Sequence, residues 1–386
     1  MIKRISGTIK EYAWGGHEFL PKLLGLEFPS EQPQAEYWLG SHPLGMTRLE
    51  ENDNTLKAYL GKAKLGELPF MLKILDVRDM LSIQVHPNKE QAEKGYDREN
   101  TEGIPIKAFH RTYKDRNHKP ELMVSLSEFW MVHGFKNAEK LSKTLEQTPE
   151  LFDLHLILMS QGVEALYQHI MTSEQVVINQ LLKPLGKRIK PQYEKGALQK
   201  TSIDFWAARA FLTHNRKGVC DRGILSLYLM NLLKLEPGQA VFQAPGVLHA
   251  YLEGQNIECM ANSDNVIRGG LTNKYIDHGE LLNVVDYQGK TILVNPMKKD
   301  TDLMSFPVNA PEFELGFFTG KDLELEVGPH PMIAFCLAGS YGIRNQEGEI
   351  SMETGEAVII TNRIRMTSLT DSPGRLVLAQ KSSPHL

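Results

Sequence analysis

Short apolar runs, broken by Gly, Pro, Asn and Asp, fill the chain from residue 1 to about residue 137. Phe70–Leu75 and Leu122–Leu126 are two of these runs. Apolar runs of this length between turn-forming residues are typical of β-strands. The first third of the chain is therefore predicted to be mainly β-structure.

The apolar positions change to a helical period near residue 138 and keep it to about residue 235. The last predicted helix, Leu225–Leu235, is followed by Pro237 and Gly238, which favour its end. Strand-like sequence then resumes. The pattern predicts a helical block, residues 138–235, inserted between the two halves of one β-domain.

A short internal repeat extends the β prediction to the end of the chain. Glu236–Phe242 resembles Glu353–Ile359, since each has a Gly two positions after the Glu, followed by Ala-Val and an apolar residue. We interpret both segments as a turn that leads into a strand. A second β-domain of the same kind is expected towards the C-terminus, and the segment that holds Pro296, Pro307 and Pro311 would link the two.

Composition narrows the function classes. A length of 386 residues predicts two or three domains, and 41% hydrophobic with 23% charged residues is ordinary for a globular protein. A net charge of -4 argues against general attraction to nucleic acid or anionic membranes. No apolar run is long enough for a spanning helix, and the N-terminus lacks an apolar signal core. Three widely spaced cysteines suggest no disulfide framework, so we expect a cytoplasmic protein.

The segment Ser82–Pro87 carries the first candidate chemistry. In a β-strand, residues two apart point to the same face, so Ser82, Gln84 and His86 would share one face. An amide oxygen and an imidazole side by side form half of a metal site. Glu121 and His249 are the candidates for the other half, and this N/O set suits zinc or a similar divalent ion.

Several separate motifs make the chain resemble the type I mannose-6-phosphate isomerases, also called phosphomannose isomerases. The matching segments are, in family order, Tyr12–Gly16, Gln84–Ala92, Lys119–Glu121 and Asn262–Tyr275. The resemblance runs from near residue 5 to near residue 290 and is looser beyond. It implies an enzyme that interconverts mannose 6-phosphate and fructose 6-phosphate through a cis-enediol. It also implies one zinc ion per chain, held by Gln84, His86, Glu121 and His249.

The resemblance also bears on the fold. Pro245–His249 is similar to the second motif of the cupins, with Gly246 three before the histidine, although the proline is one position closer than usual and no asparagine follows. We therefore expect a mainly β protein with an α-helical insertion, in which two cupin-type jelly-roll β-barrels accompany a helical domain. The expected parts are a discontinuous metal-binding barrel (1–137 and 236–305), the helical insertion (138–235) and a metal-free cupin-like β-domain (306–386).

The expected zinc site has only one anionic protein ligand. The ion would keep a net charge near +1 and remain a Lewis acid for the oxygens on which charge builds up. The alternative is a closed zinc that only ties strands together. A neutral Gln ligand such as Gln84 argues against that structural role.

Arg268 is the main candidate beyond the metal, because its planar, permanently charged fork suits sugar oxygens or a phosphate. The matching arginine of the family is an active-site residue. Glu258 and Asp264 are candidates for the proton-transfer base, with Glu258 preferred, and Lys119 would share proton transfer or hold a substrate oxygen. The remaining substrate-binding candidates are Ser82, Lys73 and Lys274 for the phosphate, and Tyr251 and Tyr275 for the cavity wall.

Two other functions stay open. The first is a metal-dependent cupin with other chemistry, such as an iron oxygenase. Such an enzyme commonly binds its iron through two His and one carboxylate and leaves other coordination positions open, so the extra ligand Gln84 argues against it. A sugar-phosphate sensor would need a damaged site, yet every expected ligand is present. For the isomerase we expect a phosphosugar as the partner, with no nucleic acid or membrane, and a monomer. Whether it serves mannose breakdown or GDP-mannose biosynthesis is left open by the sequence.

Overall fold

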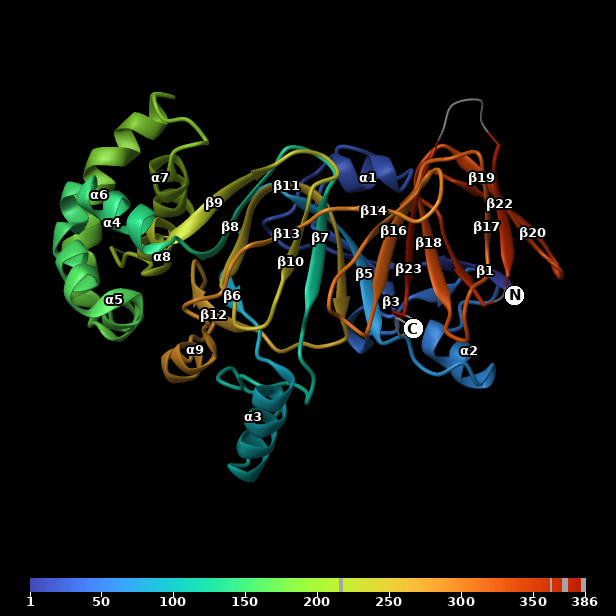
Figure 1. Cartoon of the computed structure of the whole chain (residues 1–386), viewed down its shortest axis with the longest axis horizontal. Coiled ribbons are helices and arrows are strands. Elements are labelled where there is room, and N and C mark those ends of the chain that lie inside the picture. The colour runs from blue at the N-terminus through green and yellow to red at the C-terminus, as the bar shows by residue number, and fades with distance from the viewer. Residues whose placement is uncertain (215–217, 362, 370–373, 383–386) are drawn as a thin grey trace.

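The computed structural model describes residues 1–214, 218–361, 363–369 and 374–382. It is mainly β with several helices. The helices of the middle of the chain gather at one end, and the C-terminal strands lie at the other (Figure 1). Among the described residues, no helix combines the length and the apolar character needed to cross a membrane.

An 11-stranded sheet forms the centre of the molecule. Its longest strand, β11 (His249–Ala261), pairs antiparallel with four others, β5, β6, β7 and β8. The predicted runs Phe70–Leu75 and Leu122–Leu126 lie in β5 and at β7, as expected. The other strands of this sheet are β2 (Thr8–Lys10), β3 (Glu36–Gly40), β5 (Phe70–Val77), β6 (Ile83–Val85), β7 (Glu121–Ser125), β8 (Phe129–Phe135), β9 (Met230–Leu235), β10 (Ala240–Gln243), β12 (Ile267–Gly270) and β13 (Ile292–Val294).

The middle of the chain is helical from residue 138 to residue 229. Its elements are α4 (Ala138–Glu146), the short 3-10 turn Pro149–Leu151, α5 (Phe152–Thr172), α6 (Gln175–Glu194), α7 (Ile203–His214) and α8 (Gly223–Leu229). The predicted helix Leu225–Leu235 is wrong in its second half, because Met230–Leu235 is strand β9 and pairs with β8. A segment of six residues is too short for its apolar positions to separate helix from strand, so only the available partner decides.

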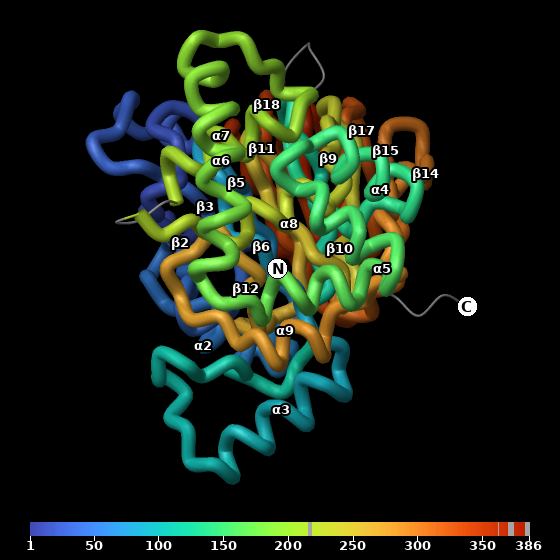
Figure 2. The backbone as a smooth tube through the Cα atoms, turned by 90° about the vertical axis from the view of Figure 1, so that its left-hand side faces the viewer, coloured from blue at the N-terminus to red at the C-terminus, as the bar shows by residue number. Residues whose placement is uncertain are grey.

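The helices pack on the central sheet. One buried cluster joins side chains of α5, α6, α7 and α8 to those of β6, β8 and β11, among them Leu166, Trp206 and Val85. Figure 2 shows the helices in front of the strands, with α3 (Lys89–Thr101) projecting below. The other short helices are α1 (Phe19–Leu23), α2 (Leu56–Lys62) and α9 (His278–Val284).

From residue 297 onward, the regular elements of the described chain are strands alone. An 8-stranded and a 4-stranded sheet contain β14 (Met297–Lys298), β15 (Leu303–Phe306), β16 (Glu314–Phe318), β17 (Asp322–Leu325), β18 (Met332–Ala338), β19 (Ser340–Asn345), β20 (Gly348–Glu353), β21 (Ala357–Ile360), β22 (Ile364–Ser368) and β23 (Arg375–Gln380). The first strand of the chain, β1 (Ile2–Ser6), joins this region by pairing with β21 on one side and β4 (Arg48–Leu49) on the other. The sequence pattern assigns residues 1–137 to one β-domain and does not predict that the first strand pairs with a C-terminal strand.

The internal repeat marks two turns with the same structure. Gly238 and Gly355 have φ of 89° and 90°, a conformation that glycine adopts without strain. In each turn the residue after the glycine donates its N–H to the glutamate carbonyl, at 3.0 Å. The side chains of Gln239 and Glu356 accept from the glutamate N–H, at 2.8 Å in both. Strands β10 and β21 follow, so the prediction of a turn leading into a strand is confirmed at both places.

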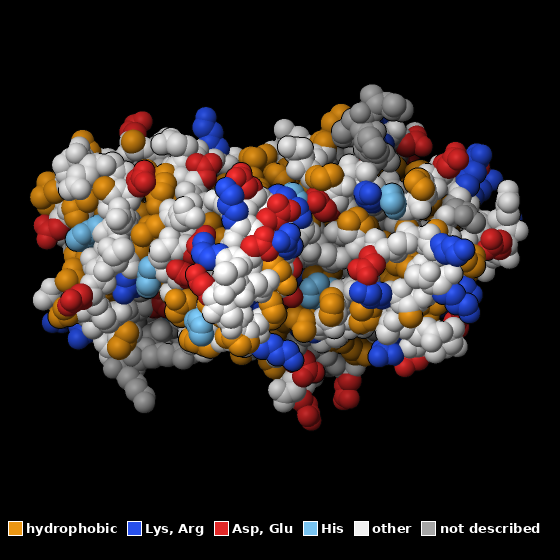
Figure 3. Space-filling view, turned by 90° about the horizontal axis from the view of Figure 1, so that it is seen from below, with side chains coloured by type: hydrophobic (Ala, Val, Ile, Leu, Met, Phe, Trp, Pro, Cys, Tyr) orange, Lys and Arg blue, Asp and Glu red, His pale blue; other side chains and the backbone are white. Residues whose placement is uncertain are grey.

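On the face seen in Figure 3, acidic and basic side chains are interspersed with apolar ones. Ion pairs between opposite charges also occur in the described chain, such as Lys94 with Glu90 and Arg98 with Glu280. Charges mixed in this way do not attract a polyanion over a wide surface.

Candidate active site

The motif that begins at Gln84 is a strand end followed by a capped helix. Asn88 accepts the N–H of Gln91 and Gln91 accepts the N–H of Asn88, each at 2.9 Å, so α3 begins directly after His86 and Pro87. This reciprocal cap fixes where the chain leaves the sheet. Gln84 lies opposite His249 on one side and opposite Arg268 on the other, so strand pairing alone brings these three residues together.

Three ligand-type side chains converge at this point. The Nε2 atoms of His86 and His249 lie 3.3 and 3.5 Å from the two carboxylate oxygens of Glu121, and all three side chains are buried. The Gln84 amide lies 3.3 Å from the Nε2 atom of His249. The four predicted metal ligands are thus gathered in one place.

Hydrogen bonds on the far side of each ring orient the two imidazoles. The Nδ1 atom of His86 lies 2.8 Å from the Asn265 carbonyl oxygen, and that of His249 lies 3.0 Å from the Val247 carbonyl oxygen. A carbonyl can only accept, so Nδ1 carries the hydrogen and the Nε2 lone pair faces Glu121. This is how metal-binding histidines are usually held.

The charges at the cluster are set for cation binding. Burial lowers the pKa of His86 to about 4, despite the opposing effect of Glu121, so the ring is neutral near pH 7. Burial would raise the pKa of Glu121, but the ammonium of Lys119, at 2.8 Å, holds it well below its usual range. A neutral imidazole and an ionised carboxylate are the forms in which these side chains bind a divalent ion.

The cluster also leaves lone pairs without donors. The Nε2 atom of His86 and the Oε2 atom of Glu121 are buried and have no hydrogen-bond partner among the described residues. Unpartnered buried acceptors are costly unless a ligand satisfies them. The residues therefore fit a divalent metal ion with nitrogen and oxygen ligands.

A cavity of about 500 Å³ opens beside the cluster. It collects seven of the predicted site residues: Lys73, Ser82, Gln84, Lys119, Asp264, Arg268 and Lys274. Thr213 and His214, at the end of α7, line it as well. The helical block supplies no ligand of the cluster, but it forms part of the cavity wall.

The Arg268 side chain makes no ion pair or hydrogen bond with the described part of the chain. Its side chain is partly buried, and burial lowers the pKa of the guanidinium. Burial and the charge of Arg268 together lower the pKa of Lys274. Two cations without a carboxylate partner in a cavity wall provide a place for an anionic group of a ligand.

Lys73 and Glu258 form a buried ion pair, with Nζ and Oε1 3.0 Å apart. Glu36 lies 3.8 Å from the same ammonium, and the Tyr251 hydroxyl donates to the other oxygen of Glu258 at 2.8 Å. Burial opposes the charge of Lys73, yet the two carboxylates raise its pKa above the usual range. Lys73 lines the cavity, whereas Glu258 and Tyr251 lie within this buried network.

Two further predicted residues have neighbours that the sequence did not reveal. Asp264 lies 3.3 Å from the Nε2 atom of His42. Burial would raise the pKa of Asp264, but the contact with His42 lowers it. Tyr275 is 40% exposed, packs against Phe109 and lines a smaller hollow next to the cavity rather than the cavity itself.

Sequence reasoning missed Glu36, Trp38 and His42. Trp38 donates its indole N–H to Glu36, and the Lys73 ammonium lies 5.0 Å from the Trp38 ring centroid. The available signal was the two-residue spacing of Glu36 and Trp38, which places them on one face of a strand. A glutamate on that face is unusual enough to suggest a buried partner.

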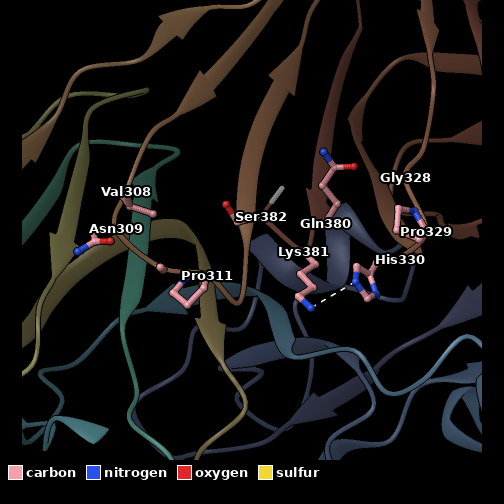
Figure 4. Close-up of a pocket in the computed structure, with 10 residues that line it drawn as sticks. Val308, Asn309, Pro311, Gly328, Pro329, His330, Gln380, Lys381 and Ser382 are labelled. Atoms are coloured by element: carbon pink, nitrogen blue, oxygen red, sulfur yellow. Dashed lines mark hydrogen bonds between the residues drawn. The ribbon is translucent and has the colours of Figure 1, made fainter. Parts of the chain in front are cut away.

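A second hollow, of about 610 Å³, lies in the C-terminal region (Figure 4). It is lined by residues 308–311, 328–330 and 380–382, and none of them is a predicted site residue. Its charged contact is weak, with the Lys381 ammonium 3.2 Å from the His330 ring. The geometry therefore places the chemistry at the His86, Glu121 and His249 cluster.

Comparisons with known proteins agree with that placement. Residues 2–138 match the family model described as phosphomannose isomerase type I, catalytic domain. The chain is 32% identical over 381 residues to the mannose-6-phosphate isomerase of Shigella flexneri, covering 93% of this chain and 94% of that protein. It is 31% identical over 353 residues to the human mannose-6-phosphate isomerase, covering 81% and 80%.

Solved structures of similar proteins superpose over nearly the whole chain. One is the mannose 6-phosphate isomerase from Salmonella typhimurium bound to its substrate, fructose 6-phosphate, and a zinc atom, with a TM-score of 0.86 and 29% identity. Another is a mannose 6-phosphate isomerase bound with zinc and yttrium, also with a TM-score of 0.86 and 29% identity. Each alignment covers 99% of this chain and 100% of the other.

Proposed function

The chain belongs to the type I mannose-6-phosphate isomerase family, and from that premise we propose how its own residues carry out the reaction. The protein interconverts mannose 6-phosphate and fructose 6-phosphate, and its cofactor is zinc. This conclusion rests on the convergence of His86, Glu121 and His249 beside a cavity. Arg268, which has no carboxylate partner in the described chain, lines that cavity.

Gln84, His86, Glu121 and His249 would hold the zinc. The bound ion supplies a Lewis acid for sugar oxygens that gain negative charge. The ligand set supports that role, because a single carboxylate compensates only one of the two positive charges of the ion. The Glu121 carboxylate also lies 2.8 Å from the Lys119 ammonium, so it compensates the charge of the ion less completely.

The protein groups must move a proton between C2 and C1 of the substrate through an enediol. Arg268 would donate to the oxygens whose charge grows in the transition state. Glu258, Lys119 and Asp264 are the candidates for the proton transfer. Lys119 and Asp264 line the cavity, whereas both oxygens of Glu258 are already hydrogen bonded to Lys73 and Tyr251, which favours the first two.

The phosphate would lie at Lys274 and Ser82, close to Arg268. Lys274 lines the cavity and has no carboxylate partner in the described chain, which supports the assignment. The charge of Lys73 is matched by Glu258 and Glu36, so Lys73 is less available to an incoming anion. Tyr251 would support Glu258, and Tyr275 would form part of the outer rim.

The finer architecture is also a proposal. We propose two cupin-type jelly rolls, the first carrying the metal and interrupted by the helical insertion, the second without a metal. The turns before β10 and β21 have the same hydrogen bond, which supports two β-units of the same kind. The first strand would then belong to the second unit, because β1 pairs with β21.

The setting of the enzyme follows from the same proposal. We expect a cytoplasmic monomer that acts on a free phosphosugar and serves mannose breakdown or GDP-mannose supply. Cys220, Cys259 and Cys336 are buried, and no disulfide joins them in the described chain, which suits a reducing compartment. Light scattering of the purified protein would test the monomer.

A coupled assay tests the central proposal. Purified protein is supplied with mannose 6-phosphate, and formation of fructose 6-phosphate is followed with and without added zinc. Turnover that needs zinc supports the proposal. Zinc-loaded protein that binds the sugar phosphate without turnover would favour a sensor. Oxygen uptake with bound iron would favour an oxygenase.

A further inference from the structure

Buried acceptors without a donor are not confined to the metal ligands. The Nε2 atom of His133 and the Oε1 atom of Gln243 are also buried and without a hydrogen-bond partner among the described residues. Both side chains are fully buried. Leaving such an acceptor unpaired is unfavourable, so each needs a donor that the described residues do not supply.

His133 lies beside the ligand His249. The two residues are directly opposite each other across β8 and β11, with ring centroids 6.2 Å apart and planes inclined by 27°. The Thr291 hydroxyl donates to the backbone carbonyl of His133 at 3.1 Å, so its oxygen accepts from Nδ1 of the ring, also at 3.1 Å. Nδ1 therefore carries the hydrogen, and Nε2 is a bare lone pair.

Gln243 lies beside the ligand Glu121. The two residues are directly opposite each other across β10 and β7. The Tyr251 hydroxyl donates to Glu258 at 2.8 Å, so it can only accept from Gln243, at 2.6 Å. The donor in that contact is the amide NH2, which fixes the orientation of the amide and leaves Oε1 without a donor.

We propose that His133 and Gln243 accept hydrogen bonds from water held at the metal ion and so position that water. The inference rests on the proposed zinc site. Water is the smallest donor that fits a closed interior, and a buried water needs two or more polar partners. Water on a metal ion is a stronger donor than free water, because the ion polarises its O–H bonds. One lone pair lies beside His249 and the other beside Glu121, so the two acceptors flank the ligand cluster.

The arrangement would tighten zinc binding and is testable without measuring turnover. Partners of this kind typically change metal affinity by about 10–100-fold when removed. His133→Phe and Gln243→Met each remove the acceptor at similar size. His133→Gln and Gln243→Glu retain an acceptor. Met131→Leu is the matched control, because Met131 lies two residues from His133 on the same strand and is equally buried, but has no strong acceptor.

The measurements are zinc affinity by competition with a chromophoric chelator, and thermal unfolding of the apo and zinc-loaded forms. His133→Phe and Gln243→Met should weaken zinc binding by about 10–100-fold. Their apo forms should unfold at the same or a higher temperature than the apo wild type, because an unpaired buried acceptor has been removed. His133→Gln should restore part of the affinity. Visible spectra of the cobalt-substituted protein should change in the Phe and Met variants, since they report coordination of the ion.

Three outcomes would overturn the inference. In the first, the Phe and Met variants bind zinc within twofold of the wild type and keep the cobalt spectrum. In the second, their apo and zinc-loaded forms are destabilised equally, as a packing defect predicts. In the third, a zinc-loaded structure shows His133 bound directly to the ion. The proposed function fails separately, if the wild type itself neither binds zinc nor isomerises the sugar.

Discussion

Arg268 is a cation in a cavity wall with no carboxylate partner in the described chain, opposite Gln84 on the neighbouring strand. We predict that Arg268→Ala lowers kcat by about 10²–10³, because it removes a fixed donor for charge that develops in the transition state. Arg268→Lys should also be strongly impaired, since an ammonium cannot reproduce a two-pronged contact. Steady-state kinetics with zinc analysis of each variant checks this.

The zinc content of Arg268→Ala should stay at the wild-type level, because Arg268 is not one of the four proposed ligands. His249→Ala is the contrasting variant and should lose zinc and activity together. If Arg268→Ala keeps its kcat and only KM rises, the residue anchors the substrate and does not stabilise the transition state.

The pair of Lys73 and Glu258 is the residue-scale feature with the largest expected effect on stability. Glu258→Gln would leave a buried ammonium with Glu36 alone, 3.8 Å away. Removing one partner of a buried pair costs about 3–5 kcal/mol, and the remaining carboxylate should keep the loss near the lower value. Urea unfolding measures it. Glu90→Gln is the control, because the exposed pair of Glu90 and Lys94 contributes little. Equal midpoints for the two variants would contradict the prediction.

At the scale of elements, β1 ties the beginning of the chain to its end. Ile5 is 1% exposed and packs with Phe335, Ile359 and other side chains of the C-terminal strands. Ile5→Ala should lower the free energy of unfolding by about 2–5 kcal/mol, because a buried branched side chain is replaced by a cavity. Urea unfolding and steady-state kinetics check it.

The value of kcat should be nearly unchanged in Ile5→Ala, since Ile5 does not line the active-site cavity. Lys3→Ala, on the same strand, should change stability little, because Lys3 pairs with Glu51 near the surface. If Ile5→Ala instead impairs catalysis as much as stability, the C-terminal strands are coupled to the site in a way that the packing does not indicate.

At the scale of the whole molecule, zinc should link activity to stability. Chelation should abolish turnover, and zinc should restore it. Zinc at 100 times its dissociation constant should add about 2.7 kcal/mol to the free energy of unfolding, because the ion binds the folded site and not the dispersed ligands. Calorimetry with and without chelator measures this. Full activity in protein shown to be metal-free would contradict the proposed role of zinc as a Lewis acid.

The apo protein should lose stability as the pH falls from about 6.5. Burial lowers the pKa of His86 to about 4 and that of His133 to about 3, whereas both rings regain an ordinary value of about 6.5 on unfolding. Between these values the unfolded chain binds more protons, so acid favours unfolding, by up to about 1.4 kcal/mol per pH unit for each ring. Urea midpoints of the apo protein from pH 7 to pH 4.5 test this, and His133→Phe should show a shallower slope.

How much of the fold the sequence predicted depends on the range of the interaction. The helical block and the strands around Phe70 and Leu122 follow from local periodicity, which neighbouring residues determine by themselves. The pairing of β1 with β21 and the strand at Met230–Leu235 do not. Both depend on partners far away in the chain, and a short apolar run accepts either a helix or a strand until one of them buries it.

The site shows the same division. Gln84 and His86 were found because strand spacing places them on one face, and Glu121 and His249 because they stand in recognisable motifs. Only the tertiary structure decided that Lys73 is bound to Glu258 and that His133 and Gln243 flank the ligands with unpaired lone pairs. Hydrogen bonds and burial between distant strands set these properties, since a side chain gains its partners only when the sheet assembles. The sequence by itself determined which ligands are present, and the packing determined which of their neighbours remain without a partner.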